Sequence, residues 1–204
     1  MKIDSLVQED ISLKENCNLC QESNLGTGRK TEYGAVIIYR VGHSNKDGWF
    51  ATLSPKTGGD LEKDFTIQLM PFAHLTHFSQ ISNYTELAKN YGTSFAKLNN
   101  AMLKVIADET NFSSTAKSRE DAVSVASYGK STNWIEKKEH LHVKLFPFKG
   151  AIGQPYTVDS TFERKEVCED EFGEKFVKMQ PVKKKFIPEK RFLELSEKLI
   201  EILK

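Results

Sequence analysis

The sequence has no long hydrophobic run, little net charge and few cysteines, and each absence excludes a class of protein. Its longest apolar stretches, such as 35–39, are far shorter than the roughly 20 residues that span a bilayer, so we expect no membrane partner. The 29 basic and 28 acidic residues nearly cancel, which gives no electrostatic support for binding nucleic acid. Three cysteines in 204 residues do not suggest a disulfide framework.

The first ten residues, MKIDSLVQED, also lack the apolar run of a secretory signal. Together with the odd number of cysteines, this predicts a reducing, cytoplasmic location. An apolar fraction of 39% over 204 residues is enough for one domain with an added arm.

Hydrophobic periodicity predicts an α+β fold. Alternating or β-branched runs predict five strands, at 34–39, 48–53, 65–70, 122–128 and 140–146. The turn at 42–47 would join the first two strands as a hairpin. Between 84 and 106, apolar residues recur every three or four positions, which predicts one long amphipathic helix. Pro188 is expected to open a final amphipathic helix.

Cys17 and Cys20 form a C-x-x-C motif. Two such thiolates suit one side of a tetrahedral zinc site, although the same pair occurs in redox proteins. A thioredoxin-like pair would open a helix after a strand, and the polar flanks do not favour that. Four of the five histidines lie in two close pairs, His74 with His77 and His140 with His142. This combination predicts a metal site, in which Cys168 takes no part.

The segment HLHVKLFP at 140–147 carries the most informative pattern. In a strand, His140, His142 and Lys144 project to one face and the apolar residues between them to the other. Neutral imidazole can attack phosphorus, and a neighbouring cation can stabilise the phosphoryl oxygens. The same pattern also fits an exposed edge strand with a solvated polar face.

This string resembles the His-x-His-x-His-x-x motif of the histidine-triad (HIT) superfamily, in which x is apolar. His142 matches the middle histidine, the family's nucleophile, which takes up a nucleoside monophosphate covalently. Lys144 stands at the third histidine, a position where some members have glutamine. The segments GWFATLS at 48–54 and MPFAH at 70–74 are similar to the family's pocket strand and its Pro-x-x-His segment. The resemblance covers roughly 17–147.

The resemblance implies a HIT-like antiparallel sheet with one long helix, plus a C-terminal helical arm, and a nucleotide or nucleotide conjugate as ligand. It also implies a closed, structural zinc site formed by Cys17, Cys20, His74 and His140. His77 is a less favoured substitute for His74 in that site. The same ligands suit iron. Trp49 and Phe50 would form an apolar wall for the base, and Ser131 and Asn133 would touch the phosphates. Members of the family often form homodimers through the helix and an adjacent strand.

We therefore expect a lead-in over 1–16, a HIT-like nucleotide-binding domain over 17–150, and a loop with a C-terminal helix packed on it over 151–204. The leading hypothesis is a nucleotide hydrolase or nucleotidyltransferase that forms a nucleotidyl-histidine on His142, with Lys144 as a second catalytic residue. The alternative is a catalytically weak nucleotide-binding module with a structural zinc, which Lys144 would favour. A redox or zinc-dependent interaction protein needs only the C-x-x-C motif.

Overall fold

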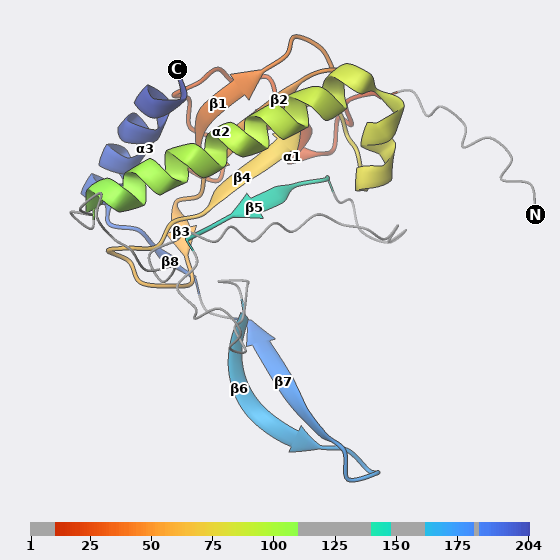
Figure 1. Cartoon of the computed structure of the whole chain (residues 1–204), viewed down its shortest axis with the longest axis vertical. Coiled ribbons are helices and arrows are strands. Elements are labelled where there is room, and N and C mark those ends of the chain that lie inside the picture. The colour runs from red at the N-terminus through yellow and green to blue at the C-terminus, as the bar shows by residue number, and fades with distance from the viewer. Residues whose placement is uncertain (1–10, 110–139, 148–161, 182–183) are drawn as a thin grey trace, which may run out of the picture.

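The chain forms a four-stranded antiparallel sheet with one long helix on one face (Figure 1). The structure is a computed structural model, and it describes residues 11–109, 140–147, 162–181 and 184–204. In chain order the elements are α1 (Asn18–Glu22), β1 (Val36–Val41), β2 (Trp49–Leu53), β3 (Lys56–Thr57), β4 (Ile67–Pro71), the 3-10 helix η1 (Phe78–Asn83), α2 (Thr85–Glu109), β5 (Val143–Leu145), β6 (Phe162–Glu169), β7 (Lys175–Pro181), β8 (Lys185–Phe186) and α3 (Glu189–Leu203).

The main sheet has the strand order β1-β2-β4-β5, and each neighbouring pair is antiparallel. The predicted hairpin of β1 and β2 is confirmed. Its turn begins at Gly42, whose φ of 80° suits glycine, and a Cβ there would lie 2.5 Å from the carbonyl oxygen of Asp47. The sheet and the long helix confirm the α+β class.

The predicted last strand is shorter than expected, because β5 begins at Val143 and not at 140. The three residues before β5, at 140–142, lie outside the β4–β5 ladder and beside the segment that comes after β4. There Leu141 donates its backbone N–H to the carbonyl oxygen of Leu75, over 2.6 Å. The two histidines of the motif therefore lie just before the strand. The strand predicted at 122–128 lies outside the described residues.

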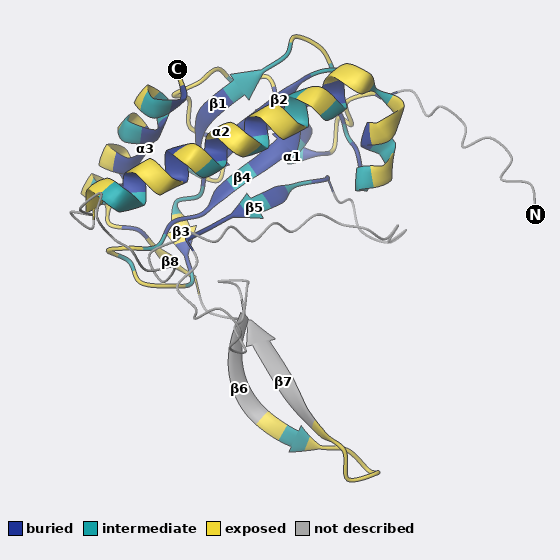
Figure 2. Cartoon of the chain, in the orientation of Figure 1, coloured by how far each residue is buried: buried dark blue, intermediate teal, exposed yellow. Residues whose placement is uncertain are grey.

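The core lies between one face of the sheet and α2, with α3 beside α2 at the end near β1 (Figure 1). Each helix buries one stripe and exposes the other, as Figure 2 shows for α2, because apolar residues recur at helical spacing. Trp49 of β2 is fully buried here, and its indole N–H donates to the carbonyl oxygen of Leu87, over 2.8 Å. None of the described helices has the length and apolarity to cross a membrane.

Ion pairs join α3 to the end of α2. Arg191 donates two hydrogen bonds to the carboxylate of Glu109, over 2.6 and 3.1 Å, and Lys198 lies 3.0 Å from the carboxylate of Asp108. The Arg191 pair is largely shielded from solvent, with side chains 14% and 26% exposed. The C-terminal helix that the sequence predicted is thus an integral layer of the fold.

The opposite face of the sheet carries a second apolar cluster, formed by Ile37, Phe50, Met70 and Phe72. Leu19 of α1 and Leu25 pack against it. Successive side chains of a strand point to opposite faces, so Phe50 belongs to this side while Trp49 belongs to the α2 side.

Several elements were not predicted from the sequence. In the 151–204 segment, where we expected a loop before the helix, β6 and β7 form a hairpin that extends away from the sheet (Figure 1). The signal available in the sequence was the pair of turn-forming residues Asp170 and Gly173. The short β3–β8 pair and η1 were also missed, since two-residue strands and single turns leave too few residues for a period to show.

We predict that Leu199→Ala lowers the free energy of unfolding by about 2–5 kcal/mol, because Leu199 is fully buried between α3 and the core. Leu193→Ala on the same helix is the matched control: Leu193 is 42% exposed and its truncation should change stability by about 0.5 kcal/mol. Urea denaturation measures both. Equal effects would mean that α3 does not pack as described.

Candidate metal centre

Four side chains from three separate segments converge beside the sheet. Cys17 and Cys20 lie at the start of α1, His74 follows β4, and His140 precedes β5. One potential ligand atom from each side chain lies within 4.8 Å of those of the other three. The metal-ligand set expected from the sequence is therefore brought together, and it contains His74 and not His77.

The spacing of these atoms suits a tetrahedral metal ion. Nδ1 of His140 lies 3.5 Å from Sγ of Cys17 and 3.4 Å from Sγ of Cys20. Nδ1 of His74 lies 3.5 Å from Sγ of Cys20. A zinc ion with ordinary Zn–S and Zn–N bond lengths sets its sulfur and nitrogen ligands about 3.6 Å apart. The four residues can therefore hold a metal ion with little movement.

His140 is oriented by a second contact on the far side of its ring. Its Nε2 lies 2.9 Å from the carbonyl oxygen of Pro71, which can only accept a hydrogen bond. The proton of the neutral ring is therefore on Nε2, and the lone pair on Nδ1 faces the two thiols. Metal-binding histidines commonly donate their other N–H to such a carbonyl.

Burial sets the protonation of the cluster. The pKa of His140 is lowered to about 4, mainly by burial and to a smaller extent by the nearby His74 and His142, against the opposing effect of the Pro71 hydrogen bond. Burial, with a smaller contribution from Lys14, also lowers the pKa of His74. Burial raises the pKa of the Cys20 thiol to about 12. Near neutral pH both imidazoles are neutral and able to bind a metal, whereas Cys20 loses its proton only when a metal replaces it.

Arg40 of β1 fastens α1 to the sheet. Its guanidinium donates to the carbonyl oxygen of Leu25, over 2.6 Å, and to that of Ser23, just past the end of α1. The same group lies 4.4 Å from the ring centroid of Phe72. Arg40 thus links the segment that bears the two cysteines to the segment that bears His74. Nothing in the sequence marked this residue, because its partners are backbone carbonyls.

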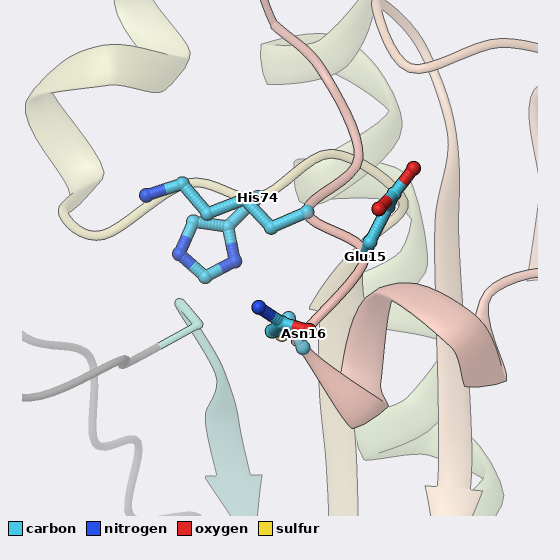
Figure 3. A pocket seen from close by; sticks show the side chains of 5 residues that line it. Glu15, Asn16 and His74 are labelled. Carbon is cyan, nitrogen blue, oxygen red and sulfur yellow. The ribbon is translucent and has the colours of Figure 1, made fainter.

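A pocket of about 370 Å³ borders the cluster (Figure 3). It is lined by Lys14, Glu15, Asn16, Cys17 and His74. Figure 3 shows the His74 ring facing Asn16 across this space. Two of the four potential ligands therefore lie on a pocket wall, while Cys20 and His140 are buried behind them.

His142 follows His140 by two positions and is half-buried. Its Nδ1 lies 3.0 Å from the backbone carbonyl oxygen of His140. Because the carbonyl can only accept, Nδ1 carries the proton and the lone pair is on Nε2. Lys144, also half-buried, lies opposite Gln68 in the ladder of β4 and β5. Gln68 was not identified from the sequence as a candidate site residue. Its signal was its polarity, because Gln68 and Thr66 are the two polar residues of the run FTIQLM.

Other expected site residues lie elsewhere. Trp49 and Phe50 are both fully buried in the two apolar clusters, and neither lines the pocket beside the four metal-binding side chains, so their expected role as a wall for a base stays a prediction. Alternation in β2 sends them to opposite faces, and neither face leaves them accessible. Ser131 and Asn133 lie outside the described residues.

The remaining candidates take no part in the cluster. His77 caps η1 through a reciprocal contact with Gln80. Cys168 lies on β6, outside the group of four, as expected.

We predict that the purified chain binds one divalent ion, and that Cys20→Ser abolishes this binding because it removes a buried ligand. Removing the ion with a chelator should lower the melting temperature, since binding energy adds to folding energy. Cys168→Ser is the matched control and should keep the full metal content. Elemental analysis measures the metal, and equal loss in both variants would contradict this assignment.

Comparison of the chain with protein-family models, curated proteins and solved structures found no match. The interpretation of the site therefore depends on its own geometry.

Proposed function

We propose that this chain is a nucleotide-binding protein of the histidine-triad type, and that it acts as a nucleotide hydrolase or nucleotidyltransferase through a covalent nucleotidyl-histidine on His142. The observation that carries this proposal is the fixed tautomer of His142, whose Nδ1–H is held by the carbonyl of His140. Nε2 of that ring has the lone pair that a nucleophile needs. The antiparallel sheet with one long helix, followed by a C-terminal helix, agrees with this assignment.

The reaction would proceed in two displacements. Nε2 of His142 attacks the α-phosphorus of the nucleotide derivative, and the bond to the leaving group breaks with its electron pair. The ring keeps its proton on Nδ1, which goes on donating a hydrogen bond to the carbonyl oxygen of His140, and the ring becomes positively charged. Water or a second phosphate then attacks the phosphorus, and the electron pair of the P–N bond returns to Nε2. Any proton of the attacking group passes to solvent.

Lys144 and Gln68 would stabilise the charge that develops on the phosphoryl oxygens. Lys144 follows His142 by two positions in the chain, and Gln68 is the direct cross-strand neighbour of Lys144. An ammonium and an amide can both donate hydrogen bonds to such oxygens.

The metal in this proposal is zinc, held by Cys17, Cys20, His74 and His140. Four protein ligands complete a tetrahedron, so the ion would be structural, and it would fix the position of His140. His142 bonds to the backbone of His140, so the metal site would also position the nucleophile. Contacts of both cysteines with imidazole nitrogens favour a metal site over a redox pair.

The second candidate is a binding module that holds a nucleotide without turnover. Lys144 favours it, because a permanent cation cannot alternate between donor and acceptor as histidine or glutamine can.

We predict that rapid-quench mass spectrometry detects a nucleoside-monophosphate adduct on the chain, and that His142→Ala abolishes it. The panel consists of phosphoramidates, dinucleoside polyphosphates and nucleotide sugars of adenosine and uridine. His43→Ala, at an exposed histidine of the β1–β2 turn, is the control and should keep the adduct. Binding without any adduct across the panel would support the binding module instead.

A further prediction concerns Lys144→His. If the lysine stabilises the transition state, this change should lower the turnover rate about tenfold or more, because a charged donor is lost. Lys89→His on α2, at a side chain 68% exposed, is the control. Steady-state kinetics on the best substrate of the panel measures both. A gain of activity in Lys144→His would show that the lysine impairs catalysis and would favour the binding module.

A further inference from the structure

The hairpin of β6 and β7 ends in a hydrogen-bonded turn that exposes an aromatic ring. Phe172 is 83% exposed at this tip, where the neighbouring residues are also exposed (Figure 2). The carboxylate of Asp170 accepts the backbone N–H groups of Phe172 and Glu174, each over 2.9 Å. Gly173 completes the turn with a φ of 80°. Phe172 is therefore presented in one backbone conformation, which lowers the entropy lost on contact with a partner.

The tip is strongly acidic. Between 169 and 175 the chain carries four carboxylates, on Glu169, Asp170, Glu171 and Glu174, against one lysine. The whole chain has a net charge of +1, so this charge is concentrated at the tip. The tip would repel a phosphate-rich surface, such as an anionic membrane or a nucleic acid, and attract a basic one.

A surface of the complementary kind lies on the β3–β8 pair. Phe186 is 65% exposed, and Nζ of Lys56 lies 4.3 Å from the centroid of its ring. Lys56 and Lys185 are both exposed. We call these three residues, Lys56, Lys185 and Phe186, the basic patch. It combines an exposed ring with positive charge, as the tip combines an exposed ring with negative charge.

The tip cannot contact the basic patch of its own chain while the hairpin stays extended. Three residues lie between the end of β7 at Pro181 and the start of β8 at Lys185, so four Cα–Cα steps place the base of the hairpin within about 14 Å of the patch. The strands of seven and eight residues carry the tip about 25 Å further from that base. Tip and patch are thus separated on each chain by roughly one hairpin length.

We propose that two copies of this chain form a two-fold symmetric dimer in which the hairpin tip of each copy docks on the basic patch of the other. When two such hairpins lie antiparallel, each tip reaches the neighbourhood of the other hairpin's base, where the patch lies. One rotation therefore forms both contacts, as a two-fold interface requires. The inference is independent of the proposed function, and it places the interface on the hairpin and not on the long helix.

Charge reversal tests this proposal on the full chain. A tip variant replaces three carboxylates but keeps Asp170, which builds the turn: Glu169→Lys, Glu171→Lys and Glu174→Lys. A patch variant carries Lys56→Glu and Lys185→Glu. The matched control for the tip variant makes the same three Glu→Lys changes at exposed positions on α2 and α3: Glu86→Lys, Glu194→Lys and Glu201→Lys. Sedimentation velocity from about 1 μM to about 1 mM measures association, and circular dichroism confirms the fold of each variant.

We expect the natural chain and the control to dimerise, more weakly at high salt, because the contact is electrostatic. Each variant alone should be monomeric. An equimolar mixture of the tip and patch variants should dimerise again, because both tip–patch pairs of the mixed dimer then join opposite charges. A natural chain that stays monomeric, a dimer that neither variant disrupts, or a mixture no more associated than its components would overturn the proposal.

Discussion

The hydrogen bond from Nε2 of His140 to the carbonyl oxygen of Pro71 is the contact on which the geometry of the site depends. It sets the tautomer that turns Nδ1 toward the two cysteines. It also joins the end of β4 to the segment that precedes β5. His142 in turn bonds to the carbonyl of His140, so the orientation of the proposed nucleophile follows from the same contact. A buried carbonyl without this partner would also cost free energy, which gives the arrangement a structural reason to persist.

The two faces of the main sheet have different roles, because successive side chains of each strand point to opposite faces. One face packs against α2 and α3 and holds the larger apolar cluster. The other face bears Lys144 and Gln68 in register, and it packs α1 against the smaller cluster of Ile37, Phe50, Met70 and Phe72. Polar side chains can gather on that second face without weakening the core, because a strand sends neighbouring residues to opposite sides. Arg40 of β1 adds to the packing of α1 on this face, because its guanidinium donates hydrogen bonds to the backbone carbonyl oxygens of Ser23 and Leu25, just after α1.

Local periodicity was sufficient to predict β1, β2, β4, α2 and α3, since each spans enough residues for its period to show. The metal-ligand set was also predictable, although only through the resemblance, because spacing alone left His74 and His77 both open. Tertiary contacts decided what the sequence did not show. Trp49 and Phe50 are aromatic in any context, and only the packing of α1 and α2 reveals that both are buried. The supporting roles of Arg40 and Pro71 depend on backbone carbonyls, which carry no signature in a sequence.

The separation of the four metal-binding side chains along the chain has a consequence for biosynthesis. His140 lies 123 residues after Cys17 and 120 after Cys20, so the centre closes only through long-range contacts. At ordinary rates of synthesis, about 6–24 s pass between the addition of Cys20 and that of His140. During that interval an ion can find at most three of its four ligands, because His140 and the strand β5 that follows it have not yet been added. Full affinity therefore arises with the last strand of the sheet, and the order of synthesis makes metal capture a late event.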